Sequence, residues 1–390
     1  MRVLHVVPDL SRAFGGPTQA LLGYLAASRV AGIDASVIAP EPSADDLSWF
    51  RAQAGDTQVD TLPKRRLGSV RFTATLLDRI RVEENSVDVI HVHGLFNPVS
   101  TFAARRCRRV RVPYIIRPFG TLSRYTFEHR RRLLKRAWFS ILDAPAIRGA
   151  GALHFTTTEE RDEARRLPAV RATPDAIVPP PWLPDATAQL AENGEFCRGH
   201  RSDARPETVL FLSRIHRKKG LETLIDAWPA VRAARPTARL VIAGSGEPGY
   251  ERDLKARVVE QGSGESVYFA GFVTGAAKAR WLAAADVFVL PSFHENFGVS
   301  VLEAMSAGLP AVVSPDVQLA AVVQENRLGA VVPRDAAMLA RGLLSVLEDT
   351  ALRERCAVHG AAIIQSLFSP ATIGAQLRAM YELARSPSTL

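Results

Sequence analysis

Cysteine is scarce in this sequence. Only three of the 390 residues are cysteines, and they stand at positions 107, 197 and 356. They are far apart and show neither the spacing of a disulfide framework nor that of a metal site. The pattern fits a protein of a reducing compartment, and it predicts no cysteine-bound metal.

Long apolar runs are also missing. No stretch approaches the roughly 18–20 apolar residues that a membrane-spanning helix needs. The first residues, MRVLHVVPDL, form a short apolar run without the longer apolar region and the small-residue cleavage site of a signal peptide. We therefore expect a soluble chain in the cytoplasm.

Aromatic residues make up only 7% of the chain, whereas the formal net charge is +9. Such a charge favours an anionic partner, which could be nucleic acid, an anionic membrane face or a phosphorylated small molecule. A nucleic-acid binder would interleave aromatic with basic residues or carry a recognisable module, and neither pattern is present. The arginines cluster instead in two segments, 104–112 and 128–139. We expect no nucleic-acid partner.

Short β-branched runs alternate with longer helix patterns through most of the chain, which predicts parallel sheets covered by helices on both faces. In the first half we expect strands at 2–7, 34–40, 87–94, 112–118 and 151–157. In the second half we expect strands at 208–215, 238–244, 266–272, 286–292 and 310–315. The sequence therefore predicts two doubly wound α/β domains, each resembling a Rossmann fold.

A stretch rich in proline and polar residues separates the two halves. It predicts a first domain over 1–180, a linker over 181–206 and a second domain over 207–368, followed by a last helical segment over 369–390. Ligands of open parallel sheets bind at the carboxyl ends of the strands. Candidate site residues are therefore sought where strand patterns end.

The segment HENFGVSVLEAMSAGLP, residues 294–310, begins just after a strand pattern and runs into a helix pattern at Gly298. The free N–H groups and the partial positive charge of a helix start favour phosphate. Glu295 and Glu303 stand on either side of this turn, so a ligand with hydroxyls on both sides of a phosphate would fit. A sugar nucleotide has that layout. The alternative is a structural turn, in which the glutamates only serve the helix dipole.

Two cations follow the first strand pattern of the second half. In FLSRIHRKKG, residues 211–220, Arg214 and Lys219 come after the strand end. An arginine and a lysine together can neutralise a diphosphate and stabilise charge on a leaving group. The alternative is that both are solvated loop charges.

Glycines and histidines mark two places in the first half. FGGPTQAL opens a helix pattern with Gly15 and Gly16, but it is not the G-x-G-x-x-G fingerprint, so NAD binding is poorly supported. In VIHVHGLFNP, strand alternation puts His91 and His93 on one face, with His93 at the strand end. Histidines in strands are more often structural, so this pattern alone leaves the role of His93 open.

These segments together resemble the retaining GT-B glycosyltransferases of family 4, also called group 1. The string HENFGVSVLEAMSAGLPAVVS looks like the family's segment with two glutamates eight residues apart, and the likeness covers nearly the whole chain. The resemblance implies a nucleotide-diphosphate sugar as co-substrate, no other cofactor, and transfer to a glycan, lipid-linked or small-molecule hydroxyl with retention at the anomeric carbon. It also implies that the last helix returns to pack on the first domain.

The resemblance assigns roles residue by residue. It implies that Glu295 lies beside the donor sugar and Glu303 at the ribose hydroxyls. The amide turn that meets the diphosphate would be Asn296, Phe297 and Gly298. The diphosphate clamp would be Arg214, Lys219 and Gly220, and the glycine pair of the first domain would be Gly15 and Gly16.

Two further positions match with less distinctive motifs. His93 matches a functional histidine near the transferring sugar, and RPFGTLSRY matches a loop in which Arg117 and Gly120 would contact donor or acceptor. The chain departs from the family at VPPPWLP, residues 178–184, where a Pro-Asn-Gly turn is common. That departure predicts a stiffer hinge and removes any role for the asparagine of the turn.

No Asp-x-Asp motif occurs in the sequence, so we expect catalysis without a metal. Other readings remain open. The same fold could carry sugar-nucleotide epimerisation or sugar-phosphate transfer, or the chain could be a catalytically silent relative that binds a partner. A basic nucleic-acid or membrane-binding protein without catalysis is a further alternative.

The arginine-rich segment 130–147 has apolar residues, Trp138 among them, at helical spacing beside its basic residues. That composition is typical of an amphipathic helix that lies on a membrane surface. The alternative is a helix docked on the sheet with a solvated basic face, and both remain open. A lipid-linked acceptor would favour the first, because an anionic inner leaflet attracts basic segments.

Overall fold

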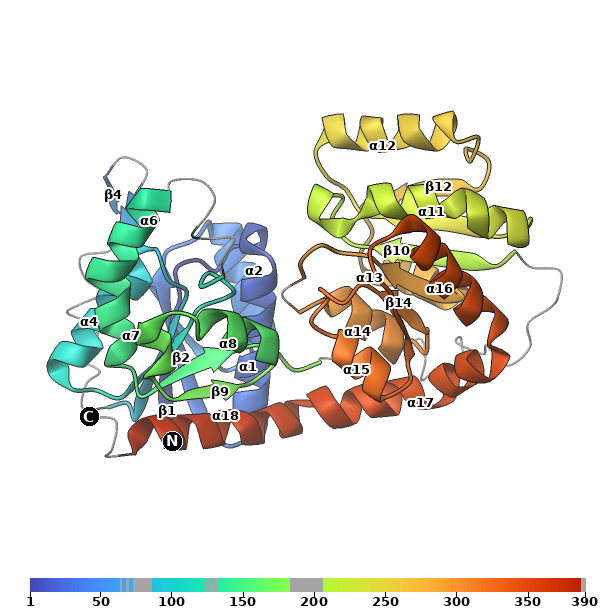
Figure 1. Cartoon of the computed structure of the whole chain (residues 1–390). Coiled ribbons are helices and arrows are strands. Elements are labelled where there is room, and N and C mark those ends of the chain that lie inside the picture. The colour runs from blue at the N-terminus through green and yellow to red at the C-terminus, as the bar shows by residue number, and fades with distance from the viewer. Residues whose placement is uncertain are drawn as a thin grey trace. The chain divides into compact units, whose positions relative to one another are not determined.

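The computed structural model describes residues 1–63, 65–67, 70–72, 86–123, 127, 132–182, 206–295 and 297–386. The chain divides into two compact units. Unit 1 comprises Met1–Leu183 together with Phe368–Leu390, and unit 2 comprises Pro184–Leu367. Each unit is a parallel sheet with helices on both faces (Figure 1). Most of the expected linker, 181–206, falls outside the described residues.

The sheet of unit 1 is parallel throughout and has the strand order β3-β2-β1-β6-β7-β8-β9. Its strands are β1 (Arg2–Val6), β2 (Asp34–Pro40), β3 (Gln58–Leu62), β6 (Val89–His93), β7 (Tyr114–Arg117), β8 (Ala152–Phe155) and β9 (Asp175–Ile177). A separate antiparallel pair consists of β4 (Arg65–Leu67) and β5 (Val70–Phe72). The sequence did not predict β3 and β9, because polar residues interrupt β3 and β9 has only three residues.

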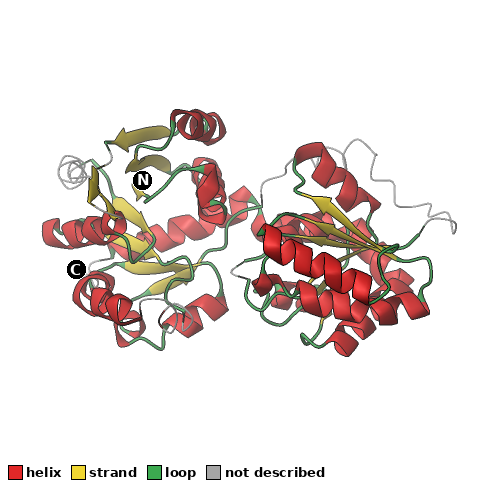
Figure 2. Ribbon diagram, turned by 90° about the horizontal axis from the view of Figure 1, so that it is seen from above, coloured by secondary structure: helices red, strands yellow, loops and turns green. Residues whose placement is uncertain are grey.

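Helices cover both faces of this sheet, as Figure 2 shows. They are α1 (Gly16–Val30), α2 (Ala44–Ala54), α4 (Pro98–Val110), α6 (Arg132–Trp138), α7 (Ala144–Arg148), α8 (Thr158–Ala164), α9 (Pro168–Arg171) and α18 (Pro370–Arg385). A π-helical turn, Phe139–Asp143, joins α6 to α7. One core cluster lies under α4 and α7, and another lies under α1 and α18.

The last helix packs closely on the first. Gly374 of α18 lies against α1, where an added Cβ atom would come within 2.5 Å of the Ala27 carbonyl oxygen. Ile373, Leu377 and Tyr381 of α18 are fully buried in the same cluster. The C-terminal helix is therefore part of the core of unit 1.

Unit 2 has a six-stranded parallel sheet in the order β12-β11-β10-β13-β14-β15. Its strands are β10 (Thr208–Leu212), β11 (Arg239–Ala243), β12 (Val267–Gly271), β13 (Val287–Leu290), β14 (Ala311–Val313) and β15 (Gly329–Val331). Its helices are α11 (Leu221–Ala234), α12 (Pro248–Glu260), α13 (Gly275–Ala284), α14 (Val299–Ser306), α15 (Ala320–Glu325), α16 (Ala336–Glu348) and α17 (Thr350–Phe368). Two sheets of this kind make the GT-B fold.

One helical stretch, Thr350–Arg385, is long and apolar enough to cross a membrane by length and composition alone, contrary to the expectation that no such stretch exists. Packing within the two units buries part of it, 28% of its most apolar window. In α17, Gly360 lies so close to α14 that an added Cβ would be 2.5 Å from the Met305 carbonyl oxygen. The other half of the stretch is α18, which begins at its own N-cap, Ser369, and belongs to the core of unit 1.

Candidate functional site

The first group of predicted site residues lies at the carboxyl edge of the unit 2 sheet. The loops that follow β10, β13 and β14 are joined there by backbone hydrogen bonds. Phe293 N–H donates to the Lys218 carbonyl oxygen at 2.7 Å, and Glu295 N–H donates to the Asp316 carbonyl oxygen at 3.2 Å. Because both bonds use backbone atoms, they hold the three loops in a defined arrangement at this edge.

Gly220 shows why the sequence needs a glycine after Lys219. Its backbone is left-handed, with φ at 69°, and an added Cβ would come within 2.1 Å of the Pro291 carbonyl oxygen. Only glycine allows this approach without strain or displacement. The short 3-10 helix Arg217–Lys219 is thereby pressed against the end of β13, which fixes the backbone that carries Lys219.

Lys219 and Glu295 form an ion pair, in which the lysine Nζ donates to the glutamate Oε2. The two side chains are only 10% and 18% exposed, so water screens the pair weakly. Gly298 is the N-cap of α14, with φ at 88°, and an added Cβ there would lie 3.3 Å from the Glu295 Cγ. A cation, a carboxylate and a helix N-terminus therefore meet at one place.

The amide turn between the two glutamates is described in part. The Phe297 side chain is buried, with 7% exposure, so it fixes the turn to the core of unit 2. Asn296 lies outside the described residues. The α14 N-terminus has no side-chain cap, which leaves the first N–H groups of the helix as potential donors to an anion.

Glu303 lies one turn into α14 and accepts a hydrogen bond from Lys278 Nζ at 2.6 Å. These side chains are 14% and 16% exposed. Lys278 comes from α13 and was not predicted from the sequence. Its helix, GAAKARWLAA, carries two cations, Lys278 and Arg280, and nothing in the local pattern sets Lys278 apart.

Arg214 lies beyond the end of β10, and its side chain is exposed, with no hydrogen bond or ion pair to any residue that the structure describes. Its neighbourhood is strongly cationic. Burial lowers the pKa of His216, and the charges of Arg214, Lys218 and Lys219 lower it further. This loop therefore presents positive charge with only part of it paired, which suits an anionic ligand.

The second group of predicted residues lies in unit 1. Gly15 is the N-cap of α1, with φ at 73°, and no side-chain cap covers this helix start. A Cβ added at Gly15 or at Gly16 would meet no atom within 4 Å. The space where a side chain would stand is therefore open at both glycines, and the left-handed φ at Gly15 favours glycine there.

His93 is fully buried at the end of β6, and its Nε2 lies 2.9 Å from the Nδ1 of His5. Next to it, His91 bonds to the Tyr381 hydroxyl at 3.0 Å and to His154 at 3.2 Å. Burial holds the pKa of each of these histidines well below its usual value, so the rings are neutral at pH 7. The sequence pattern pointed to His91 and His93 but gave no signal for His5 and His154.

The nitrogens of His5, His91 and His93 lie within 4.8 Å of one another, a spacing that would suit a metal ion. The chemistry of the group argues against one. Both ring nitrogens of His91 already have hydrogen-bond partners. The nearby Arg117 cation lowers the pKa of the three rings and would likewise repel a metal.

Arg117 ends β7 and is also buried, with 2% exposure. Gly120, in the loop that follows, donates its N–H to Glu160 Oε1 at 2.5 Å, and Thr156 N–H donates to Oε2 at 2.7 Å. Burial raises the pKa of Glu160, although these bonds oppose the shift. Glu160 was not predicted, although TTTEE, residues 156–160, has the spacing of a helix cap.

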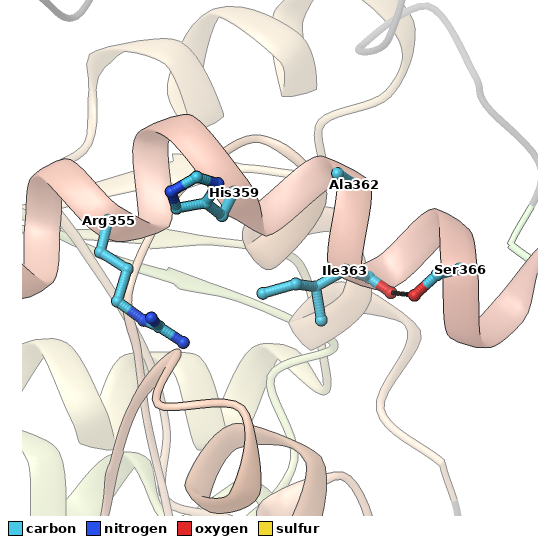
Figure 3. Close-up of a pocket in the computed structure, with 5 residues that line it drawn as sticks. All are labelled: Arg355, His359, Ala362, Ile363 and Ser366. Atoms are coloured by element: carbon cyan, nitrogen blue, oxygen red, sulfur yellow. Dashed lines mark hydrogen bonds between the residues drawn. The ribbon is translucent and has the colours of Figure 1, made fainter.

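A shallow depression lies on the outer side of α17, lined by Arg355, His359, Ala362, Ile363 and Ser366 (Figure 3). Its lining comes from one helix, and it contains none of the predicted site residues. The Ser366 hydroxyl donates to the Ile363 carbonyl of the same helix at 2.8 Å. This depression therefore has no part in the candidate site.

Solved structures share the fold over the full length of the chain. The crystal structure of Anabaena Alr3699/HepE in complex with UDP has a TM-score of 0.74 and 20% identity, and the match covers 98% of this chain and 100% of that one. Sucrose-phosphate synthase from Thermosynechococcus elongatus has a TM-score of 0.69 and 19% identity, with 98% of each chain covered. The protein is therefore an α/β protein of the GT-B class.

Sequence comparison identifies the family. Residues 15–181 match the "Glycosyl transferase 4-like domain" and residues 206–349 match "Glycosyl transferases group 1". The chain belongs to the family 4, or group 1, glycosyltransferases.

Curated relatives differ in how much of their length is matched. Phosphatidyl-myo-inositol mannosyltransferase of Mycobacterium tuberculosis is 34% identical over 48% of this chain and 50% of its own length. Alpha-D-kanosaminyltransferase of Streptomyces kanamyceticus is 28% identical over 78% of this chain and 80% of its own length. The match spans about half the length of the first few curated relatives.

Proposed function

We propose that the protein transfers a sugar from a nucleotide-diphosphate sugar to a hydroxyl group of an acceptor, with retention at the anomeric carbon. The observation that carries the proposal is the meeting of Lys219, Glu295 and the Gly298 helix start at the edge of one sheet. A lysine and free helix N–H groups suit a diphosphate, and the carboxylate suits sugar hydroxyls. Membership of the family points to the same activity.

In the proposed reaction, the bond between the anomeric carbon and the diphosphate oxygen breaks while the acceptor oxygen bonds to the same face of the sugar. The acceptor proton passes to the departing phosphate. Negative charge grows on the diphosphate, and Lys219, Arg214 and the α14 N–H groups stabilise it. We propose that no metal is needed, since the sequence lacks the Asp-x-Asp motif that binds a metal diphosphate.

Lys278 gives the proposed ribose residue a defined orientation. Its ammonium group donates to Oε1 of Glu303 and so fixes how the carboxylate is turned. Because both side chains are mostly buried, a rotation of the carboxylate would break a weakly screened ion pair. The Glu303 side chain is thus preorganised for the ribose hydroxyls before the donor binds.

The test is a thermal-shift screen of the full chain with UDP-, GDP- and ADP-sugars, followed by a transfer assay with the sugar nucleotide that binds. A ligand that binds only the native state raises the melting temperature. We expect Lys219→Met to lower turnover by more than about tenfold, because one diphosphate cation is lost. Lys255→Met is the matched control, since that lysine sits on the Phe269 ring away from the helix start. No response to any sugar nucleotide, or donor epimerisation without transfer, would overturn the proposal.

We also propose that unit 1 binds an anionic membrane surface through α6 and its continuation. Leu133, Leu134 and Ile141 are 73%, 68% and 66% exposed, and no residue of α6 is buried. Exposed arginines flank them, with Arg105 of α4 donating to the Ile141 carbonyl oxygen at 3.2 Å. The exposed apolar side chains could enter the acyl-chain region of an anionic bilayer, and the arginines beside them could contact its headgroups. The proposed cytoplasmic location at the inner membrane face depends on this contact.

A further inference from the structure

One face of the unit 1 sheet changes from apolar to polar residues along its strands. Near the amino ends of the strands this face is apolar and carries Val3, Val89, Ile115 and Ala152, under α1 and α18. Two residues further along each strand, the same face carries His5, His91, Arg117 and His154, with His93 beyond them. All five are buried, with exposure of 2% or less. We call these five residues the polar layer.

Arg117 is the charged member of the polar layer, and its hydrogen bonding is incomplete. Nη2 donates to the Thr156 hydroxyl at 3.2 Å, whereas Nε and Nη1 are buried without a partner among the described residues. The guanidinium lies over the rings of Tyr24, at 4.6 Å, and Phe119, at 4.4 Å. Glu160 holds two backbone N–H groups with its two oxygens. A buried cation with two unpaired nitrogens is costly unless a further group binds to it.

His93, which lies beside Arg117, also has a buried nitrogen without a hydrogen-bond partner. His93 and Arg117 are register partners on β6 and β7, so both side chains leave the same face of the sheet. His93 Nδ1 is buried and unpaired, as is His5 Nε2 at the other end of the His5–His93 hydrogen bond. In the described part of the chain, four nitrogens of three neighbouring residues thus lack partners.

Phe119 covers both residues. Its ring lies 4.4 Å from the Arg117 guanidinium carbon and 5.7 Å from the His93 ring. Its backbone is left-handed, with φ at 57°, which is uncommon for a bulky residue, and Gly120 beside it has φ at 70°. Phe119 is half-buried, so rotation of its side chain would uncover the pair.

We propose that Arg117 and His93, beneath Phe119, bind one oxyanion, a carboxylate or a phosphate, that the acceptor carries. The nearby Glu160 carboxylate offsets part of the guanidinium charge through space, but its two oxygens accept from backbone N–H groups, so Arg117 keeps two buried nitrogens for a further acceptor. An oxyanion supplies both acceptor oxygens and the opposite charge, and guanidinium pairs with carboxylate and phosphate better than with other groups. The site lies at the carboxyl ends of the strands, where ligands of such sheets bind. Its assignment to the acceptor rests on the proposed function.

The first test is calorimetric titration of the full chain with sodium phosphate, against sodium chloride at equal ionic strength. We expect the wild-type protein to bind phosphate and Arg117→Gln to lose at least tenfold of that affinity. Arg29→Gln is the control, since Arg29 is an exposed arginine of unit 1 whose Nη2 donates to the Ala54 carbonyl oxygen. Equal phosphate binding by wild type and Arg117→Gln would overturn the site.

A second test covers the case in which Arg117→Gln does not fold. Phe119→Ala removes the cover and keeps both polar residues. We expect phenylglyoxal, which modifies arginine, to label Arg117 faster in Phe119→Ala than in wild type. Phosphate should slow that labelling at least fivefold, as measured by mass spectrometry of the peptide. Labelling that phosphate does not slow would mean that water fills the site and would overturn the proposal.

The source of the oxyanion is tested separately. The same protection experiment is repeated with phosphate in the presence of saturating nucleoside diphosphate. Unchanged protection by phosphate supports an acceptor group, whereas protection by the nucleoside diphosphate itself would assign the site to the donor and overturn the acceptor assignment. Phosphate binding at Arg117 is measured without any transfer reaction, so a failed transfer assay and a failed anion site give different results.

Discussion

The four buried histidines of unit 1 should make that unit sensitive to acid. His5, His91, His93 and His154 are fully buried, and burial is the main reason that their pKa values are low, with that of His5 at about 3. In the unfolded chain the pKa of each is about 6.5. The unfolded state therefore binds more protons below pH 6.5, and the stability present above that pH is lost as the pH falls towards the folded values.

The size of the effect follows from the difference in pKa. Each histidine that stays neutral in the folded state lowers the free energy of unfolding by about 1.4 kcal/mol for every pH unit below 6.5. The four together therefore lower it by roughly 6 kcal/mol at pH 5.5. Domains are stable by about 5–15 kcal/mol, so this loss is large enough to unfold a marginal one. Glu160 acts in the opposite direction, because its raised pKa makes protonation of the folded state easier as the pH falls. One carboxyl offsets only part of the loss from four imidazoles.

Unit 2 is the internal control, because its described histidines, His216, His294 and His359, are all exposed. The assay is hydrogen exchange followed by mass spectrometry at pH 8, 6.5 and 5.5, corrected for the intrinsic exchange rate. We expect the free energy of opening to fall for peptides from β1, β6 and β8 and to change little for peptides from β10 and β13. In His5→Gln the fall should be shallower. Equal acid sensitivity of the two units, or none in unit 1, would refute the reasoning.

Three further predictions concern the donor site and the membrane surface. Gly220→Ala should destabilise unit 2 by more than about 2 kcal/mol, because alanine is disfavoured in the left-handed region and its Cβ meets the Pro291 carbonyl. Urea unfolding at the wild-type midpoint would contradict it. Lys278→Met should weaken nucleotide binding roughly tenfold by calorimetry, because Glu303 loses the partner that orients it, and an unchanged affinity would remove Lys278 from the site. The double variant Leu133→Glu, Leu134→Glu should lose flotation with anionic vesicles while its melting temperature is kept, and flotation of the variant equal to wild type would exclude the surface.

Much of the fold could be predicted from local patterns. The ten predicted strands all correspond to strands of the two sheets, because buried parallel strands are continuous apolar runs that stand out from helix patterns. Edge strands were harder to predict. Three were missed, and they bury only part of their side chains, so their apolar signal is weak: Gln58–Leu62, Asp175–Ile177 and Gly329–Val331.

For the site, the sequence determined the family and the motif positions, because the glutamate segment and the Arg–Lys loop are contiguous strings whose chemistry can be read locally. Only the tertiary structure decided the pairings. Lys219 and Glu295 are 76 residues apart, and Lys278 and Glu303 are 25 apart. The polar layer likewise depends on strand register, which places His5 beside His91 across 86 positions of the chain. Such contacts follow from the order in which strands pair, and no local pattern contains that order.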